Sequence, residues 1–334
     1  MASFHSRHHR HRSHASREAL VTVVILILHH AESTQTEPAV TAATLWCPDV
    51  CDCYNNMETL DCSQRRLHVV PERLPQSALR VYLEDNNIGQ IDPEEFKRSR
   101  RLSQLVLDRN RLTSVHTASF CAMTSLQELS LSANMIGSFQ VSRRPGCVSV
   151  ALRQLDLSLN LLTAVPVNLS SFAPRLEIID LSCNEITTAT LDSSFRQLTS
   201  LRQLDLSRNR IHFLLTTDFE PLRGVPLDVL NLAETELAVI EDNALCPLSD
   251  NLKYLSLMGN PLDPDNLARA LSRYAPRDVN AGSGNLTEHN TSAPETVQSD
   301  VPLPLTRLSI GEMSVGNLSR HMLAQFHRES EKKR

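Results

Sequence analysis

An eleven-position sequence frame recurs along most of this 334-residue chain and limits its fold more than any other feature. The frame reads L-x-x-L-x-L-x-x-N-x-L, and two of its copies are the near-identical stretches LRQLDLSLN and LRQLDLSRN. Successive copies are 24 to 26 residues apart, and a period of this length predicts a stack of similar coils. Coils 1 to 8 begin at Ala78, Leu102, Leu126, Leu152, Leu176, Leu201, Leu227 and Leu252.

Apolar positions of the frame indicate how each coil is built. Positions 4 and 6 lie on the same side of a short strand, because side chains alternate along an extended chain. A single coil leaves its apolar top and bottom open, so stacking is needed to bury a continuous core. The stacked strands should form a parallel sheet with neighbours about 4.8 Å apart. On the far side of the coils a spine of phenylalanines is expected from Phe96, Phe120, Phe195 and Phe219.

The ninth frame position is Asn in seven coils and Thr235 in coil 7. The turn after each strand leaves backbone groups without a partner in the sheet, and an Asn amide can both donate and accept hydrogen bonds. We therefore expect a column of Asn side chains that joins the coils. A looser coil is expected at Thr235, and also at Met313, which takes the ninth position of a further copy beginning at Leu305.

Residues 1–33 are typical of a secretory signal peptide. A basic stretch containing Arg7, Arg10 and Arg12 precedes the apolar run from Ala19 to Leu28. That run is too short to cross a bilayer as a helix, which takes about 20 residues. A disordered tail that leads into a buried strand is the alternative. We expect a secreted, extracellular chain without a membrane span, in which residues 34–46 form a linker.

Four cysteines are clustered directly after this linker, in the spacing C-x3-C-x-C-x8-C. They are Cys47, Cys51, Cys53 and Cys62. A zinc site is disfavoured, because Cys51 and Cys53 are too close in sequence for a zinc knuckle. Disulfides are favoured, because they form in exported proteins.

The stretch CPDVCDC and the following LDCSQRRLHVVPERLP resemble the cysteine-rich N-terminal cap of extracellular leucine-rich-repeat proteins. That superfamily includes the small leucine-rich proteoglycans, Tsukushi, Slit and the Toll-type receptors, and the resemblance extends to Pro276. It implies the pairs Cys47–Cys53 and Cys51–Cys62. It also implies an α/β-type solenoid, a horseshoe with a parallel sheet on its concave face and an irregular or short-helical convex side.

The resulting domain organisation has four parts after the linker. Residues 47–77 form the cap, and 78–276 form the eight repeats. Residues 277–304 read as a flexible polar insertion, because they are rich in Asn, Ser, Thr, Gly and Pro. Residues 305–334 begin a ninth, truncated repeat without the second cysteine cap that closes most members of the superfamily. We expect a fragment of a longer protein, with some other cover of the exposed end as the alternative.

Covalent modification is expected at several positions. Four N-x-S/T sequons suit glycosylation of an exported chain, and they begin at Asn168, Asn285, Asn290 and Asn317. Cys121 and Cys147 occupy comparable convex positions of neighbouring coils, so a disulfide and two buried free thiols are both open. Cys183 at an exposed strand position and Cys246 on the convex side should not pair with each other.

Side chains that leave the concave side of the strands form the candidate binding face. The expected binding residues are Tyr82, Asp156, Asp180, Asp205, Arg208 and Tyr254. Three adjacent aspartates repel one another, which is compatible with a basic partner or calcium. The favoured interpretation is that the LDLS motif is habitual in such repeats, with Arg153 and Arg202 neutralising the column. No metal site or cofactor is predicted.

A basic cluster lies on the convex side of coil 1, formed by Lys97, Arg98, Arg100 and Arg101. A glycosaminoglycan is a possible partner for it, but a solvated run of charge is the favoured interpretation. The net charge of -5 gives no reason to expect nucleic acid.

The function predicted from these features is binding to an extracellular protein ligand or receptor, in the matrix or in modulation of signalling ligands. No catalytic motif with supporting context is present, so an enzyme is not expected. The alternative is the truncated ectodomain of an adhesion or Toll-type receptor. An intracellular regulator is less favoured.

Overall fold

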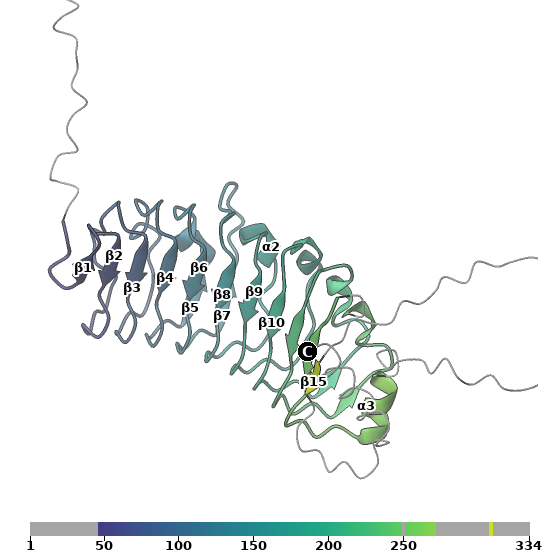
Figure 1. Ribbon diagram of the computed structural model, residues 1–334. Helices are drawn as coiled ribbons and strands as arrows, with labels where there is room; N and C mark the ends of the chain where they lie inside the picture. The colour runs from purple at the N-terminus through teal and green to yellow at the C-terminus, as the bar shows by residue number, and fades with distance from the viewer. Residues whose placement is uncertain (1–45, 249–250, 272–306, 310–334) are drawn as a thin grey trace, which may run out of the picture. The chain divides into compact units, whose positions relative to one another are not determined.

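The computed structural model describes residues 46–248, 251–271 and 307–309, and the structural statements below concern these residues. Figure 1 shows them as coils whose strands lie side by side in one sheet. The sheet begins with the antiparallel cap strands β1 (Asp52–Tyr54) and β2 (Thr59–Asp61). Every later pair of neighbours is parallel, in the order β3 (Arg80–Tyr82), β4 (Gln104–Val106), β6 (Glu128–Ser130), β8 (Gln154–Asp156), β9 (Ile178–Asp180), β10 (Gln203–Asp205), β12 (Val229–Asn231), β14 (Tyr254–Ser256) and β15 (Arg307–Ser309).

The frame explains where these strands lie. In coils 1 to 8 the strand covers frame positions 3 to 5, and the register aligns position 4 of one coil with position 4 of the next, as in Leu105 with Leu129. Position 4 is completely buried in coils 1 to 8, and so is position 6. The predicted leucine-rich-repeat solenoid with a parallel sheet is therefore confirmed. We call the surface formed by positions 3 and 5 the sheet face, and the part of each coil from position 12 onward the opposite side.

Short helices and two small parallel sheets form the opposite side. The two sheets pair β5 (Ser114–His116) with β7 (Ser138–Gln140), and β11 (Phe213–Leu214) with β13 (Val239–Ile240). The helices are η2 (Thr117–Phe120), α2 (Leu169–Phe172), η3 (Ser193–Gln197), η4 (Glu220–Leu222), η5 (Cys246–Leu248) and α3 (Pro264–Ala270).

The expected phenylalanines, Phe96, Phe120, Phe195 and Phe219, are all completely buried. A fifth buried ring, Phe172 of α2, has its centroid 6.5 Å from that of Phe120. The expected set lacked Phe172, which lies 20 residues after the first residue of its coil, whereas the other four lie 18 or 19 residues after theirs.

Buried Asn side chains join each coil to the one before it. The Asn134 amide donates from Nδ2 to the carbonyls of Leu107 in the preceding coil and Leu131 in its own coil, both at 3.0 Å. Its Oδ1 accepts the backbone N–H of Leu112 in the preceding coil at 3.1 Å. The same arrangement recurs at Asn86, Asn110, Asn160, Asn184, Asn209 and Asn260.

Thr235 interrupts this column in coil 7. Its side chain is completely buried, and its hydroxyl lies 3.0 Å from both the Leu232 carbonyl and Asn260 Oδ1. Both partners are in coils 7 and 8, so among the described residues the hydroxyl makes no bond back to coil 6. A looser junction between coils 6 and 7 remains a prediction.

A second column, which the sequence did not reveal, occupies frame position 8. Its residues are Asp85, Arg109, Ala133, Leu159, Cys183, Arg208, Glu234 and Gly259, and all adopt positive φ angles between 52° and 69°. A non-glycine residue in this conformation costs about 1–2 kcal/mol. Hydrogen bonds between coils offset this cost. The Leu159 N–H, for example, donates to the Ser182 carbonyl at 2.9 Å. Cys183 is thus in a turn, and the expectation of an exposed strand position is wrong.

Several expected segments lie outside the described residues. These are the signal peptide, the linker up to residue 45, and the insertion at 277–304. Of the expected ninth repeat only β15 is described, and it pairs in parallel with β14, with Leu308 aligned on Leu255.

The adjacent residues Asn86 and Asn87 provide a matched test of the Asn column. Asn86 is 6% exposed, and its Oδ1 accepts the N–H groups of Arg65 and Leu67. Asn86→Ala leaves these and three carbonyl groups without a side-chain partner, so we expect a loss of about 3–5 kcal/mol in unfolding free energy. Asn87→Ala, at a half-buried side chain outside the column, should cost about 0.5 kcal/mol or less. Urea unfolding followed by circular dichroism measures both, and equal losses would contradict the role of the column.

Candidate functional site

Two disulfides fasten the cap to the first coil. Cys47 pairs with Cys53 and Cys51 pairs with Cys62, with Cα atoms 6.0 Å and 4.3 Å apart. These are the pairs that the resemblance implied. Cys51 and Cys62 are buried in the core together with Leu60, so the cap covers the apolar end of the coils.

A third disulfide joins coils 2 and 3 on the opposite side. Cys121 and Cys147 have their Cα atoms 4.7 Å apart, within the range that a disulfide needs. Of the two alternatives left open by the sequence, the structure has the bridge. Cys183 is not in a disulfide and lies beside the Arg208 side chain. The Cys246 thiol is directed at Asn243 Oδ1, 3.4 Å away.

The sheet brings the three predicted aspartates together. Asp156, Asp180 and Asp205 are aligned with one another on the adjacent strands β8, β9 and β10. Each carboxylate accepts, through Oδ1, the backbone N–H of the serine two residues later, at 2.8 to 2.9 Å. Asn231 binds the Ala233 N–H in the same way at 3.1 Å. One oxygen of each aspartate therefore stabilises the turn after its own strand, which is a structural reason for the LDLS motif.

The arginines beside this column bind other carboxylates. Arg153 forms an ion pair with Glu177 at 2.9 Å, and Arg202 forms one with Asp228 at 3.8 Å. The expectation that these two arginines neutralise the aspartate column is therefore wrong. Their actual partners lie in the next coil, in a separate row at frame position 2.

The column therefore keeps carboxylate oxygens without an ion pair at the sheet face. Asp205 Oδ2 accepts a hydrogen bond from Asn231 Nδ2 at 2.9 Å. The Oδ2 atoms of Asp156 and Asp180 have no hydrogen bond or ion pair with any described residue. Burial raises the pKa of Asp180, its bonds to Ser182 lower it, and the charges of Asp205 and Asp156 add a smaller increase. These half-buried carboxylates thus belong to neighbouring strands, which are about 4.8 Å apart, and no Lys or Arg side chain of the described residues forms an ion pair with them.

The other predicted binding residues do not gather around the aspartates. Tyr82 shares their frame position on β3, but β4 and β6 separate it from β8, and its hydroxyl donates to Gln104 Oε1 at 3.1 Å. Tyr254 is at frame position 3 on β14, beyond β12. Arg208 lies in the turn after β10, at frame position 8, where it forms an ion pair with Glu234 at 3.3 Å.

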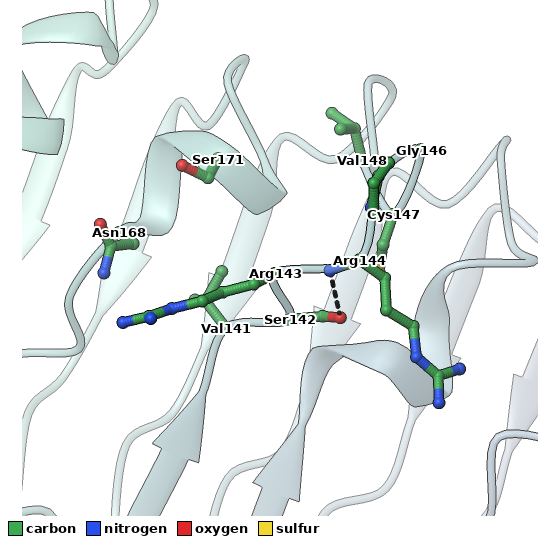
Figure 2. A pocket seen from close by; sticks show the side chains of 10 residues that line it. Val141, Ser142, Arg143, Arg144, Gly146, Cys147, Val148, Asn168 and Ser171 are labelled. Atoms are coloured by element: carbon green, nitrogen blue, oxygen red, sulfur yellow. Dashed lines mark hydrogen bonds between the residues drawn. The ribbon is translucent and has the colours of Figure 1, made fainter.

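Asn168 is an exposed residue directly before α2, and it has a φ of 61°. The hydroxyl of its sequon serine, Ser170, is buried and donates to Gln197 Oε1 at 3.2 Å. A cavity of about 430 Å³ lies between Asn168, Ser171 and the loop of residues 141–148 (Figure 2). Asn285, Asn290 and Asn317 are outside the described residues.

The described residues contain neither a metal-binding cluster nor a membrane-spanning helix. They contain no group of three or more His, Cys, Asp or Glu side chains arranged to hold a metal ion, and the three aspartates do not form one. No helix in the described part of the chain is long and apolar enough to cross a membrane.

The coils, the Asn column and the cap disulfides define a leucine-rich-repeat protein with a cysteine-rich N-terminal cap. The family model "Leucine rich repeat" matches residues 79–136 and 150–211. Mouse podocan-like protein 1 is 31% identical over 222 residues, which are 66% of this chain and 38% of the relative. Mouse podocan is 30% identical over 213 residues, which are 62% of this chain and 33% of that protein. The chain therefore carries leucine-rich repeats that match this family model, and it spans between a third and two fifths of the length of these two relatives.

The crystal structure of human 5T4, a trophoblast glycoprotein, superimposes with a TM-score of 0.51. The match covers 65% of this chain and 82% of that one, at 23% sequence identity. At this identity the match shows the shared fold alone.

Asp180 gives a pH-dependent test of the column. Its pKa is higher in the folded chain than the ordinary value of 3.8. Such a carboxylate costs stability when ionised, so the cost is absent below the unfolded pKa and complete above the folded one. Asp180→Asn keeps an acceptor for the Ser182 N–H and should raise the melting temperature at pH 7, with a gain that disappears below about pH 4.

Asp180→Ala is the matched control, because it removes the charge together with the acceptor. We expect it to lower the melting temperature across the pH range, since the Ser182 N–H loses its partner. A gain for Asp180→Asn that is the same at pH 3 and pH 7 would contradict the raised pKa.

Proposed function

We propose that this chain is a secreted leucine-rich-repeat protein that binds another extracellular protein through its sheet face, without catalysing a reaction. The observation that carries the proposal is the row formed by Asp156, Asp180 and Asp205, in which no described cation neutralises the charge. A partner that presents Lys or Arg side chains would supply the missing counter-charge. Interfaces of this kind gain specificity and association rate from complementary charge.

Secretion is supported by the cysteines. Six of the eight cysteines form three disulfides in the described residues, and such bonds persist in oxidising compartments. The basic and apolar pattern of residues 1–33 suits export through a signal peptide. The exposed side chain of Asn168, the first residue of a sequon, could be glycosylated on the same route.

Several features of the sheet face favour a protein ligand over a small molecule. Its strands are three residues long and aligned in register, so the mostly half-buried rows at positions 3 and 5 run across many coils. Stacked repeats commonly use such extended surfaces for binding. The resemblance to small leucine-rich proteoglycans supports work in the extracellular matrix or in modulating a signalling ligand.

Single substitutions can place a new glycan on either side of the stack. Glu128→Asn creates the sequon Asn-Leu-Ser on β6, next to the strand of Asp156, and leaves all three aspartates intact. Gln197→Asn creates Asn-Leu-Thr on the opposite side of coil 5. Each variant is expressed as the full chain in animal cells, and endoglycosidase treatment should reveal the added glycan as a mass shift.

The measurement is retention of the secreted chain on the matrix that the cells deposit. The glycan introduced by Glu128→Asn should reduce retention at least fivefold, because it covers the partner's surface. The one introduced by Gln197→Asn should leave retention within twofold of the unmodified chain. Equal retention of both variants would overturn the sheet-face proposal, and an unglycosylated chain in the cytosol would overturn secretion.

A further inference from the structure

The opposite side of coils 1 to 3 carries arginines that have no acidic partner among the described residues. We call Arg98, Arg100, Arg101, Arg143 and Arg144 the arginine face. All five are exposed. The other exposed cation of coil 1, Lys97, forms an ion pair with Glu94 at 2.6 Å.

The basic cluster of coil 1 and the disulfide of coils 2 and 3 occupy equivalent positions in their coils. Lys97, Cys121 and Cys147 each lie five residues before the first residue of the next coil. The basic cluster of coil 1 is therefore level with the disulfide that joins coils 2 and 3. Coil 2 lies between the two groups of arginines and presents Cys121, Ala122 and Thr124, which are small and uncharged.

Acidic side chains are missing from this region. Residues 109–127 and 129–155 contain no Asp or Glu, although the whole chain has 38 of them. Coil 1 does contain Asp92, Glu94 and Glu95, but these are engaged locally. Asp92 Oδ1 accepts the Glu94 N–H at 2.8 Å, Glu95 Oε2 accepts the Asp92 N–H at 3.0 Å, and Glu94 binds Lys97.

The loop that carries Arg143 and Arg144 is fixed at both ends to coil 2. Before the arginines, the Ser142 N–H donates to Thr117 Oγ1 at 2.8 Å, and Ser142 Oγ accepts the Arg144 N–H at 3.2 Å. After them, Cys147 is bonded to Cys121. Figure 2 shows Arg143 extending toward Asn168 and Arg144 extending away from it. Two guanidinium groups are thus held at different points along the stack.

We propose that the arginine face binds a sulfated polysaccharide chain that runs along the opposite side from coil 1 to coil 3. Guanidinium groups bind tetrahedral oxyanions with paired donors, and a linear polyanion can contact the two groups together. Between Leu83 and Lys253 the chain has no Tyr or Trp, and the phenylalanines of coils 1 to 3 are buried. Nucleic-acid bases would therefore find no exposed Tyr, Trp or Phe side chain here on which to stack.

This proposal is independent of the sheet face, because the two surfaces lie on different sides of the coils. It also gives the Cys121–Cys147 bridge a second role besides joining the coils. The bridge closes the loop of Arg143 and Arg144 over coil 2, so loss of the bridge should loosen both arginines relative to those of coil 1.

Binding of the secreted full chain to immobilised heparin tests the proposal, with the dissociation constant measured at 0.15 M salt and at higher salt. We expect measurable binding that weakens steeply with salt, because screening acts on exposed charges. Arg143→Gln with Arg144→Gln should weaken binding at least tenfold, and so should Arg98→Gln with Arg100→Gln. Asn168 lines the cavity beside Arg143, so each loss should appear with and without N-glycans.

The control is Arg196→Gln with Arg223→Gln, which makes the same charge change on the opposite side of coils 5 and 6. It should alter the dissociation constant less than twofold. Cys121→Ser with Cys147→Ser should weaken binding at least threefold while circular dichroism remains that of the folded chain. Equal losses in the control, or absence of binding at 0.15 M salt, would overturn the proposal. Equal or tighter binding to single-stranded DNA or to phosphatidylserine vesicles would overturn the assignment to a sulfated polysaccharide.

Discussion

The rest of the structure depends on the hydrogen bonds of the buried Asn column. Each Asn amide satisfies backbone groups of its own coil and of the coil before it, at the point where the chain leaves the sheet. Without these bonds the turn would bury unpaired carbonyl and N–H groups, each at a cost of about 1–3 kcal/mol. Because the column holds the coils from inside, the side chains that leave the sheet face and the opposite side are free to vary.

At frame position 8, in the turn after each strand, the backbone likewise supports the coil while the side chain belongs to the surface. Position 8 requires a left-handed backbone, yet it accepts Asp, Arg, Ala, Leu, Cys and Glu as well as Gly. Backbone bonds to the next coil hold this conformation whatever the side chain is, as between the Cys183 N–H and the Ser207 carbonyl at 2.9 Å. The difference between Leu159 and Arg208 in the two near-identical stretches falls at this position, on the surface.

The sequence was sufficient to predict most of the interior, although it missed the buried ring of Phe172. Periodic leucines and asparagines have one physical use in a stacked coil, so the strands and the Asn contacts follow from them. The same was true of burial at Phe96 and Phe120. Surface ion pairs could not be predicted in this way, because the partner of Arg153 depends on which residue of the next coil lies level with it. That residue is Glu177 and not an aspartate of the column.

The two surfaces give the chain two chemically different sides. The sheet face carries the aspartate row, and the opposite side of coils 1 to 3 carries arginines without acidic partners. An acidic and a basic surface on one rigid support would allow a protein and a polyanion to be held together. Both surfaces depend on residues that contribute little to the core, which is why the repeat frame does not specify them.

Carboxyl footprinting tests the central claim most directly, because it measures which acidic side chains a bound partner covers. The secreted chain would be labelled while retained on the cell-deposited matrix and again after release. The sheet-face proposal predicts that labelling of Asp156 and Asp180 falls severalfold on retention, while Glu94 and Asp242, whose side chains are 73% and 70% exposed, are labelled equally in both states. Protection of Glu94 or Asp242 with unchanged labelling of Asp156 and Asp180 would contradict it.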